Sequence, residues 1–444
     1  MRRLILSAGL FLLAPPLAAQ HLRDRIGDLF IFGEGDQPLH LGGTADPDNP
    51  ANIRVHGDHF IPAAVGSNAT IISFLTNSIG SNVANLPVSA TSGGSTFRFE
   101  GGVPVRTSTS AGPIFGERAQ TMGRGRVLAG ITRTGLTFAT LRGVDLRNLG
   151  FTFTHANSDF EGCDEANGGA DCSLLGVPTL ENETISLNLA LTLRLTVTSF
   201  LLTYGLSDRV DLGIVLPVVS TSLVGQSTAQ INPFGPPPAV HFFGGTPDNP
   251  VLSAERFVQG SATGLGDVAA RAKVNLRESQ PLSVAVLADV RFPTGSESDL
   301  LGSGSFGVRG LAIMSARFGS FSPHANLGYT YRGGQFQNDA VLATAGFDQL
   351  MAPWATLAVD LVSELQVGDS PLEVPEQVVI EAPYRRVITP TVIPSRRDDL
   401  VNASVGMKLS TGAGITVIAN SVWPLNRGGL RPNVIWTLGG EYSF

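Results

Sequence analysis

The sequence predicts an all-β fold, a transmembrane antiparallel β-barrel of about 12 strands preceded by a plug-like N-terminal segment. The last stretch, residues 433–444, alternates apolar and polar residues, so a strand here would have one apolar and one polar face. Mean hydropathy is +0.17, only 15% of the residues are charged and 52 of 444 are glycine, which suits alternating strands and tight turns better than a soluble enzyme. Connections between the alternating segments also switch between short and long, as they do in outer-membrane barrels.

Residues 1–20 have the pattern of a secretory signal peptide. Two arginines precede an apolar core at 4–13, and a small-residue zone at 15–19 predicts cleavage near Ala19. Loss of the two arginines changes the formal charge from −7 to −9, which argues against a nucleic-acid partner. No other apolar run is long enough for a transmembrane helix. We therefore expect the cell outer membrane of a Gram-negative-type bacterium, with membrane lipid around the barrel.

Period-2 alternation begins near residue 126 and is clearest at 185–197, where seven apolar odd positions alternate with mostly polar even ones. We predict strands near 126–138, 183–204, 209–219, 265–277, 282–292, 305–318, 322–332, 339–348, 354–366, 399–410, 414–424 and 433–444. Long connections at 139–182, 220–264 and 367–398 alternate with short ones such as 207–208, 278–281 and 411–414. This pattern predicts short periplasmic turns and long outer loops.

A set of charged residues falls on the parity opposite to the apolar row of its own predicted strand, although the first strand alternates poorly. A charge that faces lipid near the midplane costs about 2–4 kcal/mol, so the sorting indicates a polar lumen. The expected solute path comprises Arg194, Asp211, Asp267, Arg271, Lys273, Asp289, Arg291, Arg309, Asp360 and Glu364, and Arg317, Arg332, Lys408 and Glu441 share the parity. Part of this set has an alternative interpretation: Asp267, Arg271, Lys273, Asp289 and Arg291 could form an ion-pair network that holds the wall and the plug together.

The segment 21–125 contains no long period-2 run. A helical spacing of apolar residues occurs within 68–86, and residues 95–99 and 103–107 predict a short hairpin. A barrel of about 12 strands has a lumen that needs some filling. We therefore expect much of this segment to form a plug inside the barrel 126–444, with a periplasmic appendage as the alternative.

Few residues carry a chemical signature. Cys163 and Cys172 lie in a Gly- and Asp-rich stretch and predict a local disulfide in an exported protein, a free or metal-bound pair being the alternative. His56 and His59 could begin a metal site, but ordinary plug histidines are the simpler interpretation, and we predict no metal and no cofactor.

Catalysis is not predicted either, because no Gly-x-Ser-x-Gly elbow is present. A barrel-embedded hydrolase would need a Ser or Asp beside His155 or His324, the histidines near predicted strands.

Two parts of the sequence resemble known proteins. The ending, with Tyr442 and Phe444, resembles the C-terminal signal by which outer-membrane barrels are recognised, which implies the barrel-assembly machinery as a partner. The stretch Thr-Tyr-Gly-Leu-Ser-Asp-Arg-Val-Asp-Leu-Gly-Ile-Val-Leu-Pro at 203–217, with Gly-Leu-Gly-Asp-Val at 264–268 and Arg-Phe-Pro-Thr-Gly at 291–295, resembles the outer-membrane transporters named for the meta-cleavage pathway of phenol degradation. These are distant relatives of the long-chain fatty-acid channel.

That resemblance implies a plugged channel for passive uptake of small hydrophobic or aromatic compounds. The outer loops would then offer an apolar entrance at Phe234, Phe242 and Phe243. The alternative is a non-conducting structural or surface-interaction barrel, whose long loops bind a partner. A continuous lumen path would favour the channel, and an ion-paired lumen without a path would favour the alternative.

Overall fold

The structure of the protein is a computed structural model. It describes residues 21–32, 39–40, 97–100, 103–106, 111–154, 183–236, 239, 242–334, 338–380, 384–411 and 413–444.

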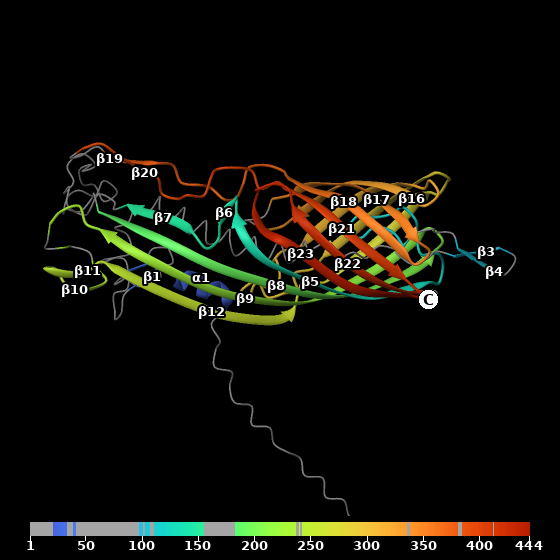
Figure 1. Ribbon diagram of the computed structural model, residues 1–444, viewed down its shortest axis with the longest axis horizontal. Helices are drawn as coiled ribbons and strands as arrows, with labels where there is room; N and C mark the ends of the chain where they lie inside the picture. The colour runs from blue at the N-terminus through green and yellow to red at the C-terminus, as the bar shows by residue number, and fades with distance from the viewer. Residues whose placement is uncertain are drawn as a thin grey trace, which may run out of the picture.

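Twelve long strands form one closed antiparallel barrel, which confirms the predicted fold (Figure 1). The last strand pairs with the first, so the wall has no free edge along this circuit. In order around the wall the strands are β5 (Val127–Leu141), β8 (Thr184–Ser207), β9 (Val210–Asn232), β13 (Ala269–Arg277), β14 (Leu282–Arg291), β15 (Gly307–Ala316), β16 (Phe321–Arg332), β17 (Ala340–Ala352), β18 (Ala355–Gln366), β21 (Leu400–Ser410), β22 (Ile415–Pro424) and β23 (Leu430–Ser443). Each corresponds to one predicted strand. We call the end with the short connections and the C-terminus the turn end, and the other the loop end.

The loop end continues into a sheet that the sequence did not predict. β8 pairs with β5 through residues 193–204 and with β7 (Leu149–Thr154) through 184–189. β9 pairs with β13 through 210–215 and then with β12 (Ser253–Leu265) through 218–230. We call β7, β12 and the far halves of β8 and β9 the outer sheet; Figure 1 shows it extending away from the barrel. The predicted loops 139–182 and 220–264 therefore contain strands.

Polarity reverses along β8 where the barrel passes into the outer sheet. Near the turn end Phe200, Leu202 and Tyr204 are exposed on the outer face, as lipid-facing residues should be. From Ile185 to Val197 the apolar odd positions are buried on the inner face, and the outer row is polar. The physical reason is that a half-strand standing beyond the hydrocarbon has water outside, so its apolar row turns inward. This corrects the prediction for Arg194, which is exposed on the outer row and does not face the lumen.

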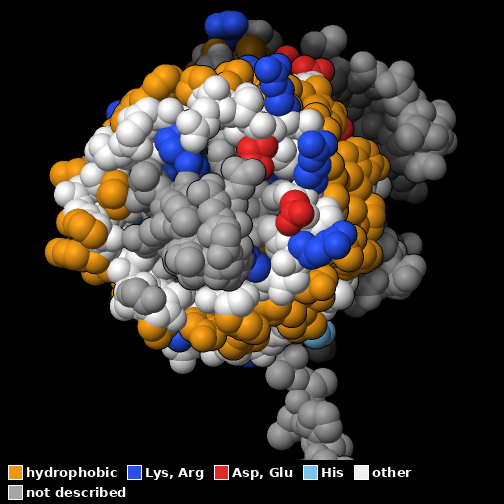
Figure 2. Space-filling view, turned by 90° about the vertical axis from the view of Figure 1, so that its right-hand side faces the viewer, with side chains coloured by type: hydrophobic (Ala, Val, Ile, Leu, Met, Phe, Trp, Pro, Cys, Tyr) orange, Lys and Arg blue, Asp and Glu red, His pale blue; other side chains and the backbone are white. Residues whose placement is uncertain are grey.

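The outer wall of the barrel carries an apolar band between two groups of aromatic side chains, as membrane barrels do. Figure 2, seen toward the turn end, shows apolar side chains around the circumference and charged ones within the rim. Exposed aromatic residues of the two groups include Phe318, Phe321, Trp354, Tyr442 and Phe444 near the turn end, and Phe292, Phe306, Tyr329, Tyr331, Trp423 and Trp436 toward the loop end. The described part of the chain contains no helix long and apolar enough to span a membrane.

The apolar core lies inside the outer sheet. Helix α1 (Leu22–Asp28) and the residues after it place Ile26, Leu29 and Phe32 against the inner faces of β8, β9 and β12, each with no exposed surface. Arg256 Nε donates to the Ile31 carbonyl at 2.6 Å and Ser227 Oγ to the Leu29 carbonyl at 2.6 Å. The N-terminal segment thus covers the inner face of the outer sheet, which would otherwise expose apolar surface to water.

Short elements complete the chain. The predicted hairpin is confirmed as β3 (Phe97–Glu100) paired with β4 (Val103–Arg106). The helical pattern within 68–86 lies outside the described residues. The remaining pairs are β1 (Ile31–Phe32) with β2 (Leu39–His40), β10 (Gly244–Thr246) with β11 (Asn249–Val251), β19 (Val378–Ile380) with β20 (Arg386–Ile388), and β6 (Val144–Asp145) with β5.

Candidate functional site

Residues 111–125 pass through the lumen near the turn end. Their backbone is held by side chains on the inner rows of the wall: Ala111 N donates to Thr356 Oγ1 at 3.0 Å and Ala119 N to Ser315 Oγ at 3.1 Å. Asn326 binds Glu117 twice, accepting from its N–H at 2.8 Å and donating to its carbonyl at 3.0 Å. The inner rows are polar because they must pair the N–H and C=O groups of a segment that forms no sheet of its own.

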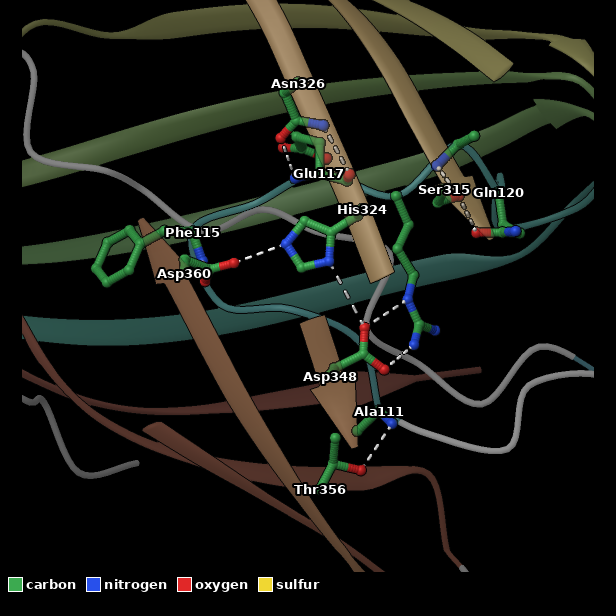
Figure 3. A network of polar contacts seen from close by, with 12 residues as sticks. Ala111, Phe115, Glu117, Gln120, Ser315, His324, Asn326, Asp348, Thr356 and Asp360 are labelled. Atoms are coloured by element: carbon green, nitrogen blue, oxygen red, sulfur yellow. Dashed lines mark hydrogen bonds and ion pairs between the residues drawn. The ribbon is translucent and has the colours of Figure 1, made fainter. Parts of the chain in front are cut away.

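A charged network fixes the middle of this segment (Figure 3). His324 Nε2 lies 2.6 Å from Asp360 Oδ1, and His324 Nδ1 lies 4.0 Å from Asp348 Oδ1. Arg118 binds both oxygens of Asp348 as a planar fork. All three side chains from the wall have no exposed surface. Gly116 lies directly against the imidazole, and a Cβ at this position would overlap the ring.

A second network joins the segment to β13, β14 and β15. Arg271 contacts Glu117 at 3.3 Å and Asp289 at 3.1 Å, and Asp289 also accepts from Arg309 at 2.8 Å. Nearer the turn end, Asp211 accepts the Met122 N–H at 3.0 Å and lies 3.8 Å from Lys273 Nζ. Arg271, Lys273 and Asp289 of the predicted ion-pair network are thus ion-paired beside residues 111–125, whereas Asp267 binds a different part of the chain.

Toward the loop end, charged side chains form hydrogen bonds and ion pairs that hold the loops between strands. Asp267 accepts from Gly295 N at 3.0 Å and from Ser303 N at 2.8 Å, which ties the link between β12 and β13 to the loop that follows β14. Arg332 donates to Glu364 at 2.6 Å. The inward assignment therefore fits Asp211, Asp267, Arg271, Lys273, Asp289, Arg291, Arg309, Asp360 and Glu364, and fails for Arg194.

A hollow of about 770 Å³ lies where β5, β6, β8 and β23 meet at the base of the outer sheet. The β23 side of the hollow is irregular. The pairing of β23 with β5 shifts register around Pro432, so residues 433 and 434 have no partner in β5. Its lining joins buried apolar residues to residues of the outer row: Leu136, Phe138, Leu146, Leu191 and Leu195 against Thr137, Thr192, Arg194, Thr196 and Trp436.

The three loop phenylalanines do not form one surface. Phe243 packs against Phe32 with ring centroids 5.6 Å apart and belongs to the edge of the core. Phe234 lies 5.8 Å from the Tyr384 ring, and the Arg386 guanidinium lies over Phe234 at 5.0 Å. Phe242 is half-buried. Among the described residues, Phe234 is the one of the three that contacts another aromatic ring of the outer loops.

Several chemical predictions lie outside the described residues, namely Cys163, Cys172, His56, His59 and His155. Among the described residues no group of three or more His, Cys, Asp or Glu side chains is arranged to hold a metal ion. His324 does have aspartates beside it, but both of its nitrogens point toward carboxylates, so neither is directed at a hydroxyl or thiol nucleophile.

The sequence analysis missed Glu117, Arg118 and Asp348. Asp348 could have been found, because it lies on the charged parity of its predicted strand. Glu117 and Arg118 precede the first strand, in a segment without alternating polarity, so no sequence pattern predicts which way they face.

Residues 182–352 match the model of a family described as "Putative MetA-pathway of phenol degradation", which confirms the resemblance over this part of the chain. No curated protein matches the chain.

Solved structures with a similar fold include an outer membrane channel from Pseudomonas putida F1, 13% identical with a TM-score of 0.40, covering 73% of this chain and 98% of that one. A Pseudomonas aeruginosa FadL homologue is 10% identical with a TM-score of 0.33, covering 72% and 90%. A mutant of TodX, a monoaromatic hydrocarbon channel, has the same identity, TM-score and coverage.

Proposed function

Since residues 182–352 match the family named for the MetA pathway of phenol degradation and the chain folds as an outer-membrane β-barrel, we propose that it is a channel for passive uptake of small hydrophobic or aromatic compounds. The proposal includes the absence of any catalytic step.

The observation that carries the proposal is the hollow of about 770 Å³. Its volume lies within the range of small-molecule sites, and its mix of leucine, phenylalanine and tryptophan with a few polar groups is the usual lining of such sites. Leu136 and Phe138 line it from β5, and Leu191 and Leu195 from β8. An apolar solute would leave water there before it meets the charged lumen.

Passage through the barrel would require residues 111–125 to move. Their contacts with the wall combine hydrogen bonds and ion pairs, which water can replace one at a time, with small apolar contacts of Ile114, Ala119 and Met122. We propose that this segment is the plug and that the inward-facing charges named above line the path behind it.

The remaining assignments belong to the same proposal. Residues 1–20 would be a signal peptide, 21–125 would include the plug and 126–444 would be the barrel. The Tyr442 and Phe444 rings, stacked 5.3 Å apart and exposed, are available to the assembly machinery. The Cys163–Cys172 disulfide stays a prediction.

The test is planar-bilayer conductance of the full-length protein and of a variant lacking residues 21–123. We expect small or rare steps from the full-length protein and large steps from the truncation. Uptake of toluene by liposomes containing the full-length protein should then exceed that by empty liposomes.

One observation favours the second candidate, a non-conducting structural barrel: the lumen is crossed by buried ion pairs at Arg118–Asp348 and Arg271–Asp289. If both forms migrate as heat-resistant barrels and neither conducts, this candidate replaces the channel.

A further inference from the structure

Two arginines lie on the outer face of the wall, where the apolar band gives way to the polar outer row of the outer sheet. Arg133 of β5 pairs across the sheet with Leu438 and with Thr198, and residues directly opposite one another share a face. Leu438 is 64% exposed and Ile131, two residues before Arg133, is 46% exposed, so this row faces outward. Arg194 of β8 is also exposed, on the row that passes through Phe200 farther toward the turn end.

Arg133 and Arg194 form no ion pair or hydrogen bond with any residue that the structure describes. The cations of the lumen differ, since Arg118, Arg271 and Arg309 each contact a carboxylate. At the edge of the apolar band an unpaired guanidinium is available to an anion from outside the chain, which would offset the cost of a charge near hydrocarbon.

The residues around the two arginines supply hydroxyl groups that can donate hydrogen bonds, and they leave open space for a ligand. Arg194 lies opposite Thr137 on one side and Ser222 on the other, and Arg133 lies opposite Thr198. Beside them Gly135 has open space where a side chain would be, and the hollow of about 770 Å³ reaches Thr137, Thr192 and Arg194. Hydroxyl groups and planar guanidinium forks together match the oxygens of a phosphate monoester.

The position of Arg133 and Arg194 along the barrel axis indicates the source of the phosphate. On the turn-end side of Arg133 the outer rows are apolar, with Ile131 and Phe200, and toward the loop end they are threonine-rich along β8. Trp436, 58% exposed and opposite Gly135, lies at the same boundary, where aromatic residues mark the headgroup level. β5, β8 and β23 lie side by side here (Figure 1). The anion in this layer is the headgroup of a membrane lipid.

We propose that Arg133 and Arg194, each with the threonines around it, bind phosphate groups of phosphorylated lipid in the outer leaflet. The bound lipid would neutralise the two cations and cover the polar sector of the wall at the base of the outer sheet. The site lies outside the lumen and shares Thr137, Thr192 and Arg194 with the hollow proposed for the solute, but lipid retention can be measured without any transport.

The test measures lipid retention by the full-length protein in a non-ionic detergent, by native mass spectrometry. The probes are lipid A with its phosphates, the same lipid after enzymatic dephosphorylation, and inorganic phosphate as a competitor. The variants are Arg133→Gln, Arg194→Gln and the double variant. Arg209→Gln, which removes an exposed arginine at the turn end, is the matched control.

We expect wild-type protein and R209Q to retain phosphorylated lipid A, each single variant to bind it about tenfold more weakly, and the double variant to bind it no better than the dephosphorylated lipid. Equal retention of the two lipids by wild type, or full retention by the double variant, would overturn the proposal. Competition by millimolar inorganic phosphate would overturn the lipid assignment. If a glutamine variant does not fold, Arg133→Lys and Arg194→Lys keep the charge without the fork and should show partial retention.

Discussion

At the scale of single residues, the lumen is held together by charges that have almost no access to water. Asp348 has no exposed side-chain surface, and Arg118, which binds it, is 7% exposed. A buried pair of this kind adds little net stability, since desolvation offsets much of the attraction, but breaking it leaves one uncompensated charge. The pair therefore determines where residues 111–125 lie more than how stable the barrel is.

Replacing Arg118 with Met should release the plug. The change leaves the Asp348 carboxylate buried beside His324 and should destabilise the docked state by about 3–5 kcal/mol. We expect more frequent and longer open events in planar bilayers and faster protease cleavage within 111–125. Arg124→Met, on the same segment but exposed, is the control, with an effect below about 1 kcal/mol. Unchanged gating in R118M would show that the pair does not hold the plug.

Gly116→Ala tests the same contact by steric means. The new Cβ would overlap the His324 ring, so either the imidazole leaves Asp360 or the segment shifts. We expect an increase in conductance like that of R118M, without any change in charge. Gly310→Ala is the matched control because a Cβ there meets nothing within 4 Å. If G116A and G310A both behave like wild type, the segment does not need this close approach.

At the scale of elements, β8 is a single strand whose two halves have different surroundings. Its half near the turn end places apolar side chains outward into lipid, and its far half places them inward against α1 and β9. The strand keeps its period of 2 throughout, so the reversal comes from a change of surroundings along its length.

Leu189→Ala and Phe200→Ala should therefore separate the two halves. Leu189 is fully buried in the outer sheet, and its truncation should cost about 2–5 kcal/mol there while the barrel still resists heat denaturation. Phe200 is 46% exposed on the outer face, so its truncation should leave the outer sheet intact. Limited proteolysis of the outer loops, compared with heat-modifiable gel migration, distinguishes the effects. Loss of the folded barrel in L189A would contradict this division.

Helix α1 should be docked in a pH-dependent manner. A hydrogen bond with Asp299, 3.0 Å away, raises the pKa of His21 above 6.5. Partial burial alone would raise the pKa of Asp299, but hydrogen bonds from His21 and Ser296 outweigh it and leave this pKa below 3.8. The His21 contribution is complete below 6.5 and is lost as pH rises through its raised pKa. The Asp299 contribution is present above 3.8 and is lost as pH falls through its lowered pKa.

We therefore expect hydrogen exchange of residues 21–32, corrected for the intrinsic rate, to be slowest between these two pKa values and to speed up on the alkaline side. His21→Gln should remove the alkaline step, and an unaltered step in H21Q would assign it to another group.

At the scale of the whole molecule, closure depends on the pairing of the two ends of the barrel sequence. Val127 N donates to the Phe444 carbonyl at 2.9 Å and Phe444 N donates to the Val127 carbonyl at 3.0 Å. The Phe444 ring takes no part in these bonds and is 61% exposed. Backbone closure can thus be tested separately from the proposed recognition of the ring.

Phe444→Ala should lower the amount of protein assembled in cells while leaving refolding from urea into detergent micelles, and the stability of the refolded barrel, within about 0.5 kcal/mol of wild type. Membrane-fraction yield and urea midpoints measure the two. A loss of stability in vitro equal to the loss in cells would mean that the ring is structural and not an assembly signal.

The sequence by itself determined the barrel, because lipid on one side and a polar lumen on the other impose a period of 2 that short segments display locally. All twelve barrel strands, the closing pair and the inward row at Asp289 and Asp360 could be predicted in this way. The tertiary structure alone decided which face of 185–197 turns inward, because a period of 2 does not say whether lipid or a protein core covers the apolar row. It also brought residues 111–125 to Asp348 and His324, and α1 to the outer sheet, because contacts between distant segments leave no local period in the chain.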